Sequence, residues 1–567
     1  MEQQGSLVIV LHAHLPYGLG HNLMEEHWLY EAAAETYMPL LQMARRLEDA
    51  DLTPNFAISF TPVLIEQLAD ERFKRGFGEH LETLIELAEA ERKVRLRRGE
   101  KELAAAQQMW QDYYSDSLTF FRDVIKQDLP GAFRDAARGG GLELLTSAAT
   151  HGYLPLIGLD DNVRAQIELG VRTYQRHFGT QPRGFWIPEC GFRPAGYWEP
   201  PVGEAIAARE RRGVGDFLRE LGLEYFFIDQ PQLKMSPPHY SGNSPLRLHR
   251  LLSQPLNMRP LGVYARDFDV TGRVWQAEGG YPGDFDYLDF HKKTEEGKFR
   301  LWRVTGDKVD MADKEPYLPE RARRRVRAHA EDFVGVVRDA LRINRQVTGE
   351  DGIVVATFDA ELFGHWWFEG VAWLEEVARI VARTPGLACA TPSAHFDGHP
   401  PSWYVDLKES SWGRNNDNSV WLNEDGLWTW RNLYEAEATM QRLGSLLDGR
   451  EVSAGVAGLL RQTMRELLLL EGSDWSFMIS TWSTRDHAEW RAGCHFNDFR
   501  LLATMVERAA LGDPLAAEDW EYIRQTSERD AVFADLDLNL FWPGRFHVAQ
   551  AAPARSAKAP VARGAGR

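Results

Sequence analysis

The segment Ser6-Leu-Val-Ile-Val-Leu-His-Ala-His-Leu-Pro16 decides the fold, because a run of apolar residues ends there in two histidines. Apolar or β-branched runs of similar length recur along the chain, and long helical patterns separate them. Strands that alternate with helices are typical of βαβ units and of a mostly parallel sheet. The sequence therefore predicts an α/β fold, with strands at 6–11, 55–60, 142–148, 184–187, 225–228 and 353–358.

Polar and ionisable residues follow directly after these predicted strands. Barrels and open α/β sheets place their active sites at the C-terminal ends of their strands. Polar loops are common and would explain one or two such residues, but they poorly explain two histidines together with several carboxylates. We therefore predict one common site, with the candidates His12, His14, Thr61, Thr150, His151, Glu189, Asp229, Asp359 and Glu361.

Length, charge and cysteine content limit the function classes. The chain has 567 residues, about four times a typical ~150-residue domain, so more than one core or one very large core is expected. A net charge of −18 argues against nucleic-acid and anionic-membrane partners. Three cysteines fit a reducing compartment, and no segment has the pattern of a signal peptide or membrane span, so a cytoplasmic location is expected. The 19 tryptophans suit either sugar stacking or a Trp-rich core.

Local composition predicts several parts along the chain. Residues 1–182 and 247–398 are the two halves of a catalytic α/β domain, and 66–138 is a helical insertion in the first half. The Gly- and Pro-rich segment 183–246 is an inserted domain with a mobile loop at 234–243. Helical patterns predict a C-terminal helical domain at 399–545, and the Ala, Pro, Gly and Arg of 546–567 predict a disordered tail.

His12 and His14 occupy positions i and i+2 beyond the first predicted strand, so their side chains face the same side. Zinc hydrolases use this spacing, and His151 with Asp359 could supply the further ligands that a metal needs. Two neutral imidazoles could equally bind the hydroxyl groups of a sugar, and satisfied structural histidines are a third explanation. The spacing alone does not decide among the three.

Two carboxylates end predicted strands among aromatic residues. Glu189 lies in Gly184-Phe-Trp-Ile-Pro-Glu-Cys-Gly-Phe192, and Asp359 lies in Thr357-Phe-Asp-Ala-Glu-Leu-Phe-Gly-His-Trp-Trp-Phe368. Retaining glycoside cleavage needs a nucleophile that stays ionised and an acid whose proton is held by desolvation. Either residue alone could be a capping carboxylate, but the pair favours carbohydrate chemistry, with carboxyl groups predicted roughly 5 to 5.5 Å apart.

Five motifs in order resemble glycoside hydrolase family 57 and, within it, the α-1,4-glucan branching enzymes. They are His12-Ala-His-Leu-Pro16, Glu143-Leu-Leu-Thr-Ser-Ala-Ala-Thr-His-Gly-Tyr-Leu-Pro155, Trp186-Ile-Pro-Glu-Cys-Gly191, Thr357-Phe-Asp-Ala-Glu-Leu-Phe-Gly-His-Trp-Trp367 and Ser473-Asp-Trp475. The resemblance covers roughly residues 5–535. It implies a distorted (β/α)7 barrel with a small inserted domain and a C-terminal α-helical domain. It also implies chemistry without a metal or cofactor, so that His12 and His14 would hydrogen-bond to sugar.

The resemblance also implies roles for single residues. Glu189 matches the family nucleophile and Asp359 the acid/base, and Tyr240, in the Pro-rich loop, resembles the aromatic tip of a mobile gate. One departure is visible, because related enzymes often carry a glutamine nine residues after Asp474, where this chain has Ser483. The implied sugar-binding residues are His12, His14, His151, Arg266, Trp275, Gly283, Trp412, Trp421 and Asp474.

The implied reaction is that of a 1,4-α-glucan branching enzyme acting by retaining double displacement. The expected partner is an α-glucan such as amylose, amylopectin or glycogen, with no nucleic acid or membrane, and the oligomeric state stays open. The nearest alternative is an α-amylase or a 4-α-glucanotransferase of the same family. Two further alternatives are a metal-dependent deacetylase or amidohydrolase built on His12 and His14, and a non-catalytic glucan-binding protein.

Overall fold

Strand β1 (Gly5–Ala13) runs through a curled, mostly parallel sheet, and all of its residues are buried. The computed structural model describes residues 5–237, 244–252, 259–276, 279–295, 297–450 and 452–543. The sheet order is β10, β1, β2, β3, β4, β7, β9, β8 and β12, with β11 beside β1. These strands are β2 (Phe56–Phe60), β3 (Leu142–Ser147), β4 (Gly184–Trp186), β7 (Tyr225–Asp229), β8 (His249–Leu251), β9 (Gly262–Arg266), β10 (Gly352–Asp359), β11 (Leu387–Cys389) and β12 (Trp403–Val405).

The sheet curls until its two sides meet between β9 and β10. The backbone N–H of Asp267, just after β9, donates to the carbonyl of Val355 in β10 at 2.9 Å. Seven strands, β1, β2, β3, β4, β7, β9 and β10, thus form an incompletely paired ring. The predicted distorted (β/α)7 barrel is confirmed. The predicted strands are all present, and β9 is an additional one.

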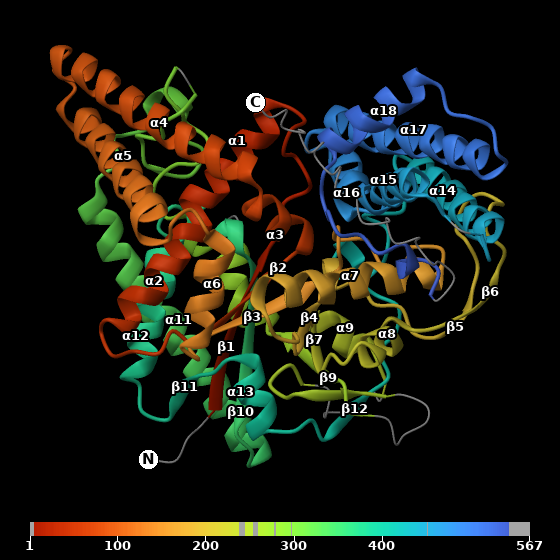
Figure 1. Ribbon diagram of the computed structural model, residues 1–567. Coiled ribbons are helices and arrows are strands. Elements are labelled where there is room, and N and C mark those ends of the chain that lie inside the picture. The colour runs from red at the N-terminus through yellow and green to blue at the C-terminus, as the bar shows by residue number, and fades with distance from the viewer. Residues whose placement is uncertain are drawn as a thin grey trace, which may run out of the picture.

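Helices cover the outside of the ring (Figure 1). Each presents one apolar face to the sheet, as α11 does with Val326, Ala330, Phe333, Val337 and Leu341 at spacings of three and four residues. The helices around the barrel are α2 (Met38–Glu48), α3 (Pro62–Ala69), α6 (Leu129–Arg138), α7 (Asp160–Phe178), α8 (Val214–Glu220), α9 (Gln230–Met235), α10 (Phe268–Trp275), α11 (Pro319–Thr348), α12 (Gly370–Ala382) and α13 (Pro392–Gly398).

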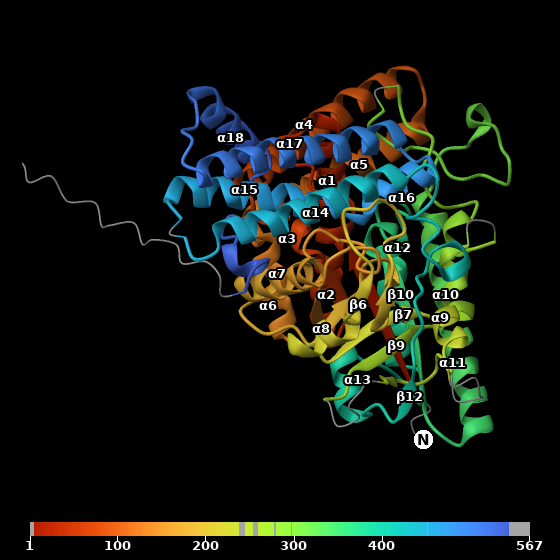
Figure 2. The same cartoon turned by 90° about the vertical axis from the view of Figure 1, so that its right-hand side faces the viewer.

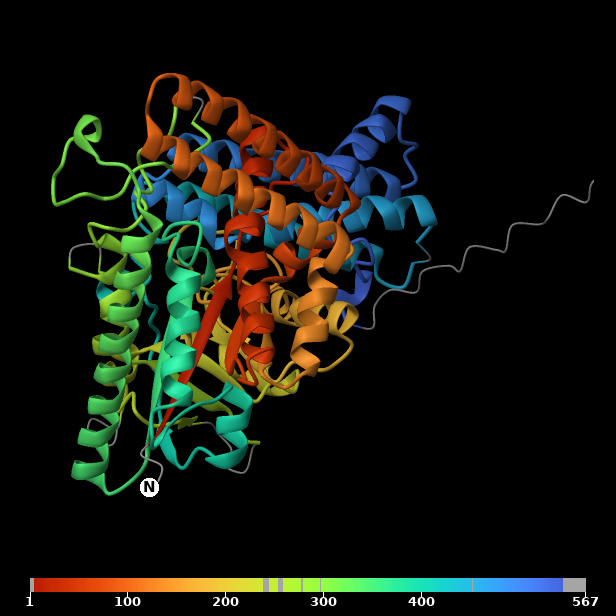
Figure 3. The same cartoon turned by 90° about the vertical axis from the view of Figure 1, so that its left-hand side faces the viewer.

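A long helical hairpin stands out from the barrel between β2 and β3. Helices α4 (Glu71–Arg97) and α5 (Lys101–Thr119) pack against each other, within the stretch that the sequence marks as helical (Figures 1 and 3). Trp110 of α5 is buried, and its indole N–H donates to the carbonyl of Arg300 at 2.6 Å. This bond fixes the hairpin to the segment that precedes α11.

The predicted inserted domain at 183–246 differs from the structure in its extent. Strands β4 and β7, which it would contain, are central members of the main sheet. The part that leaves the sheet is the loop around a separate two-stranded hairpin, β5 (Gly196–Trp198) and β6 (Arg209–Arg211). Gly and Pro are frequent there because the loops after β4 turn sharply, not because the segment has a core of its own.

A layer of C-terminal helices lies across the end of the barrel where the strands finish (Figure 2). It consists of α14 (Leu427–Leu447), α15 (Ala454–Leu470), α16 (Ser473–Thr481), α17 (Arg485–Ala510) and α18 (Ala517–Arg529), and α1 (Leu23–Ala32) lies at the same end. No helix in the described ranges is long and apolar enough to cross a membrane. The predicted tail at 546–567 lies outside the described residues.

Candidate active site

A cavity of about 620 Å³ opens at the C-terminal ends of the barrel strands. Its walls combine strand ends of the barrel with α1 and with α16 of the helical layer. Ten predicted site residues meet there, namely His12, His14, His151, Glu189, Arg266, Trp275, Asp359, Glu361, Trp412 and Asp474. The remaining wall is formed by Leu15, Pro16, Trp28, Leu362, Trp366 and Phe477.

Strand register explains why residues far apart in the sequence converge. The parallel pairing of β1 with β10 sets His12 directly beside Asp359, and the pairing of β1 with β2 sets Ser59 on the other side of His12. The pairing of β7 with β9 likewise sets Asp229 beside Arg266. Each of these residues lies at or near the C-terminal end of its strand, so their side chains reach the same rim of the barrel.

Glu189 follows β4 in a strained backbone conformation, with φ 59° and ψ 20°. Left-handed backbone is uncommon for a residue other than glycine and clusters at functional sites. The carboxylate accepts a hydrogen bond from the Trp412 indole N–H at 2.7 Å and another from the Ser473 hydroxyl at 3.2 Å. Both neighbours act as donors, so this environment suits a carboxylate that is ionised and held in one position.

A chain of hydrogen bonds runs from β2 to Glu189. Ser473 gives its only hydroxyl proton to Glu189, so it accepts from Nδ1 of His151 at 2.8 Å. Nε2 of His151 then accepts from Nε2 of His12 at 3.0 Å, and Nδ1 of His12 accepts from the Ser59 hydroxyl at 3.5 Å. Burial, with repulsion from the neighbouring histidines, lowers the pKa of His12 and His151 well below the usual value. Both are therefore neutral, as this chain requires.

Asp359 has a different environment on the opposite wall. No described residue hydrogen-bonds to its carboxylate, which leaves both oxygens available to a ligand. Burial raises the pKa of Asp359 to about 6, while the positive charge of Arg266 opposes the rise. That guanidinium is held by Asp229 through bonds of 2.9 and 2.7 Å, and it lies 5.9 Å from the ring centre of Trp412.

His14 is the imidazole of the group whose surroundings favour the protonated form. Its Nε2 bonds to Asp474 at 2.9 Å, its Nδ1 to the Thr61 hydroxyl at 3.0 Å, and its backbone N–H donates to Glu361 at 3.1 Å. Burial alone would lower the pKa of His14, but the nearby carboxylates, with Asp474 first, raise it above the usual value. In its protonated form His14 lowers the pKa of both predicted catalytic carboxyl groups.

The histidines also form a group that could hold a metal ion. One ligand atom each from His14, His151 and Asp474 lies within 4.8 Å of the others. The same atoms already have protein partners, because His14 bonds directly to Asp474 and His151 bonds to His12. The hydrogen bonds among these side chains therefore account for their close approach without a bound metal ion.

Burial raises the pKa of both predicted catalytic carboxyl groups. The pKa of Glu189 rises to about 7, which the Trp412 hydrogen bond opposes and the charge of Asp359 reinforces. The pKa of Asp359 rises to about 6. The charge of Asp359 contributes to the raised pKa of Glu189, so the order of the two pKa values does not by itself assign the roles. The hydrogen bonds distinguish the two residues, because only Glu189 is held by donors that favour the ionised form.

Three predicted residues lie behind the cavity lining: Thr61 bonds to His14, Asp229 holds Arg266, and the Thr150 hydroxyl donates to the Leu468 carbonyl. Three more do not take the predicted place in it. Trp421 is only 1% exposed and stacks on Tyr153 with ring centres 4.3 Å apart, so the prediction that it is a cleft indole is wrong. Its ring packs in the core behind the cavity wall. Gly283 lies in the turn Tyr281–Gly283, which does not line the cavity. Tyr240 lies outside the described residues, and its role as a gate stays a prediction.

The structure adds site residues that the sequence did not single out. Ser473 lies within a quoted motif, but only the fold shows that it joins His151 to Glu189. Trp28, Trp366 and Phe477 add aromatic surface to the cavity wall. Glu361, by contrast, is one of the predicted candidates, and burial raises its pKa to about 7. Aromatic residues near a strand end were a usable signal for Trp366, whereas nothing local marks Trp28 or Phe477.

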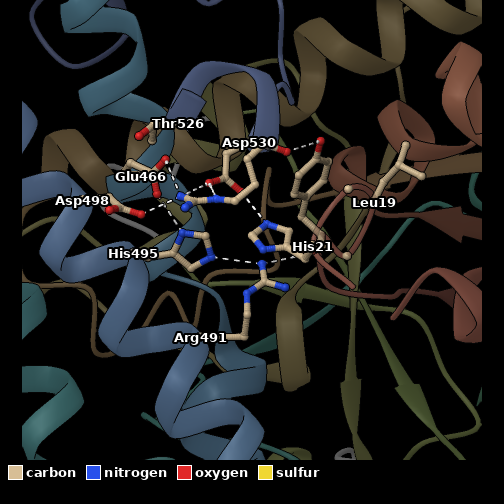
Figure 4. Close-up of polar contacts among 12 residues, drawn as sticks. Leu19, His21, Glu466, Arg491, His495, Asp498, Thr526 and Asp530 are labelled. Carbon is tan, nitrogen blue, oxygen red and sulfur yellow. Dashed lines mark hydrogen bonds and ion pairs between the residues drawn. The ribbon is translucent and has the colours of Figure 1, made fainter. Parts of the chain in front are cut away.

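The loop that follows His14 is anchored in the C-terminal helices (Figure 4). Arg491 is fully buried, donates to the carbonyl of Tyr17 at 2.7 Å and pairs with Glu25. His21 bonds to Asp530 at 2.6 Å. Further polar partners surround these pairs, namely the buried Glu466, His495 and Asp498 and the partly buried Arg529. The helical layer therefore fixes the loop that carries His14 as well as supplying Ser473 and Asp474.

Two family descriptions match this chain in succession. Residues 8–408 match Glycosyl hydrolase family 57, and residues 432–541 match 1,4-alpha-glucan branching enzyme, C-terminal. The first match spans the barrel and the second spans most of the helical layer. The chain is 38% identical over 547 residues to the 1,4-alpha-glucan branching enzyme TK1436 of Thermococcus kodakarensis, covering 94% of this chain and 77% of that protein.

Solved structures agree with this assignment. The GH57-type branching enzyme from Pyrococcus horikoshii superposes with a TM-score of 0.88 at 38% identity, over 95% of this chain and 97% of that one. The α-amylase AmyC from Thermotoga maritima superposes with a TM-score of 0.80 at 28% identity, over 95% of this chain and 99% of that one.

Proposed function

This chain belongs to glycosyl hydrolase family 57, and we propose that it is a 1,4-α-glucan branching enzyme in which Glu189 is the nucleophile and Asp359 the acid/base. The observation that carries the two roles is the difference between the carboxylates. Glu189 is held by two hydrogen-bond donors, and Asp359 faces the same cavity with both oxygens available. A nucleophile must keep its position and charge, whereas an acid/base must exchange a proton with the substrate.

In the first step, a carboxylate oxygen of Glu189 attacks the anomeric carbon of an α-1,4-linked glucosyl unit. The bond from that carbon to the 4-oxygen breaks, and Asp359 gives its proton to the leaving 4-oxygen. The Trp412 and Ser473 donors aim the nucleophile, and charged His14 stabilises its ionised form. The product is a glucan segment bound covalently to Glu189, with inverted configuration at the anomeric carbon.

In the second step, a 6-hydroxyl group of a glucan chain enters on the face that the first fragment has left. Asp359 accepts the hydroxyl proton, the 6-oxygen attacks the anomeric carbon, and Glu189 leaves as a carboxylate. The second inversion restores the α configuration and forms an α-1,6 branch. Transfer requires that water stays out, and the aromatic wall, with Trp275, Trp366 and Trp412, favours a sugar face over solvent.

Hydrolysis is the second candidate function, because the chain also resembles the α-amylase AmyC of Thermotoga maritima at 28% identity. An amylase would use the same covalent intermediate and let water take the place of the 6-hydroxyl. The match of residues 432–541 to the C-terminal part of branching enzymes favours transfer.

The substrate, product and location follow from this activity. The substrate is an unbranched or sparsely branched α-1,4-glucan, and the product fits the synthesis of a branched storage glucan such as glycogen. Cys190, Cys389 and Cys494 are all free, which supports a reducing compartment and thus the cytoplasm.

Trapping the covalent intermediate tests the assignment of roles. In Asp359→Asn, a maltooligosyl fluoride still reacts with Glu189, because fluoride leaves without an acid, but the second step lacks its base. Mass spectrometry of a digest should then find the glycosyl group on the peptide that contains Glu189. A group on any other carboxylate, or no adduct while fluoride is released, would contradict the assignment.

A further inference from the structure

Trp482 follows the last residue of α16 in an unusual conformation. Its backbone is left-handed, with φ 59° and ψ 18°, and its side chain is 69% exposed. Glycine usually occupies such a position at the end of a helix, because a side chain there is strained. A large indole in this place gains nothing from burial, and strained backbone of this kind concentrates at functional sites.

One face of the Trp482 indole is in contact with an arginine side chain. The guanidinium of Arg485 stacks over its ring, with 4.4 Å between the guanidinium carbon and the ring centre. Arg485 is itself fixed by Glu489 at 2.7 Å and by Asp425 at 3.0 Å. One face of the ring is therefore occupied and braced, and the exposed fraction of the side chain leaves the other face open to a ligand.

Two segments that line the active-site cavity converge at this point. Helix α16 lines the cavity with Asp474 and Phe477, and Trp482 comes five residues after Phe477, about 7.5 Å further along the axis at ~1.5 Å per residue. The segment that begins at Trp412 in the cavity wall returns beside the end of α16. There the Ser480 hydroxyl donates to the Val420 carbonyl at 2.6 Å, and Asp425 pairs with Arg485.

We propose that Trp482 is a stacking platform for the part of an α-1,4-glucan chain that extends out of the cavity. The proposal rests on the function proposed above and adds a site for long chains to it. The C–H face of a glucose ring matches the open indole face.

The test compares long and short glucans in an inactive background. Glu189→Gln prevents turnover, and Trp482→Gly removes the indole while placing the residue best suited to left-handed backbone at this position. Calorimetry with amylose should show a Kd about three- to tenfold higher with Trp482→Gly, as expected for the loss of one stacking contact. Maltotriose, which we expect to occupy the cavity alone, should bind equally to both proteins.

Trp520→Ala is the matched control, because Trp520 is a 44% exposed indole on α18, away from the cavity wall. It should leave both affinities unchanged. Equal amylose affinity with and without Trp482, or an equal loss for amylose and maltotriose, would overturn the proposal. So would a change in molar mass on light scattering without a change in affinity, because the indole would then serve contacts between copies. These binding measurements involve no turnover. A negative result would therefore count against the role of Trp482 and not against the branching activity, which the assay with amylose tests separately.

Discussion

Glu189→Gln should abolish activity and at the same time stabilise the protein at alkaline pH. Burial raises the pKa of Glu189 from 4.5 to about 7, so the folded state binds this proton more tightly than the unfolded state does. The parent protein therefore loses stability as the pH rises from about 4.5 to about 7, and the neutral amide is spared that loss. The difference amounts to about 3 kcal/mol, at about 1.4 kcal/mol per pKa unit. It is an upper bound, because water in the cavity still reaches the carboxylate.

Scanning calorimetry at pH 4 and pH 8 measures this effect directly. An unfolding entropy of ~2.1 cal/mol/K per residue gives ~1.2 kcal/mol/K for 567 residues, so about 3 kcal/mol corresponds to a Tm difference of about 2 to 3 °C. The variant should exceed the parent by up to that amount at pH 8 and match it more closely at pH 4. Glu518→Gln, at an exposed site on α18, should show no such pH dependence. If the Tm difference between Glu189→Gln and the parent is the same at pH 4 and pH 8, the claim that the ionised Glu189 carboxylate destabilises the folded state is refuted.

The remaining predictions concern rate and stability. The plot of kcat/KM against pH should be bell-shaped and should fall below about pH 6 and above about pH 7. Activity requires that Glu189 and Asp359 together hold one proton, and about 6 and about 7 are the pKa values of these two carboxyl groups. A flat profile from pH 5 to 9 would contradict this requirement. Trp412→Phe removes a donor to Glu189 and should lower kcat about ten- to a hundredfold and move the acidic limb upward. The buried Trp421→Phe should keep the parental kcat, and an equal loss in both variants would mean that only packing was changed. Arg491→Met should cost about 3 to 5 kcal/mol, because it removes the buried cation of Glu25 and leaves that carboxylate only Asn22 and His487 among the described residues, and an unchanged Tm would show that the network in Figure 4 carries no stability.

The sequence predicts the barrel strands better than the limits of the site. Apolar runs that end in polar residues locate β1, β2, β3, β4, β7 and β10, because buried parallel strands leave that pattern. Strand β9, Gly262–Arg266, is short, and its last residue is a charged Arg266 that only its pairing with Asp229 makes tolerable in the barrel. Its identity as a strand depends on contacts that no local pattern encodes.

Some residues of the site can likewise be predicted from the sequence, and others cannot. Glu189, Asp359 and the histidines can be predicted from their positions after strands, because the C-terminal ends of the strands lie at the same rim of the barrel. Residue type alone cannot separate Trp412, which bonds to Glu189, from Trp421, which packs in the core. The role of Ser473 depends on a contact across 284 residues of sequence, and it becomes visible only when α16 is placed over the barrel.

The central claim is that the covalent glucan segment passes to a 6-hydroxyl group and not to water. Incubation with amylose, followed by proton NMR, counts new α-1,6 linkages against new reducing ends in one sample. We expect α-1,6 signals to grow while reducing-end signals stay nearly constant, and neither to change with Glu189→Gln. Growth of reducing ends without α-1,6 signals would contradict the account and identify the enzyme as an amylase.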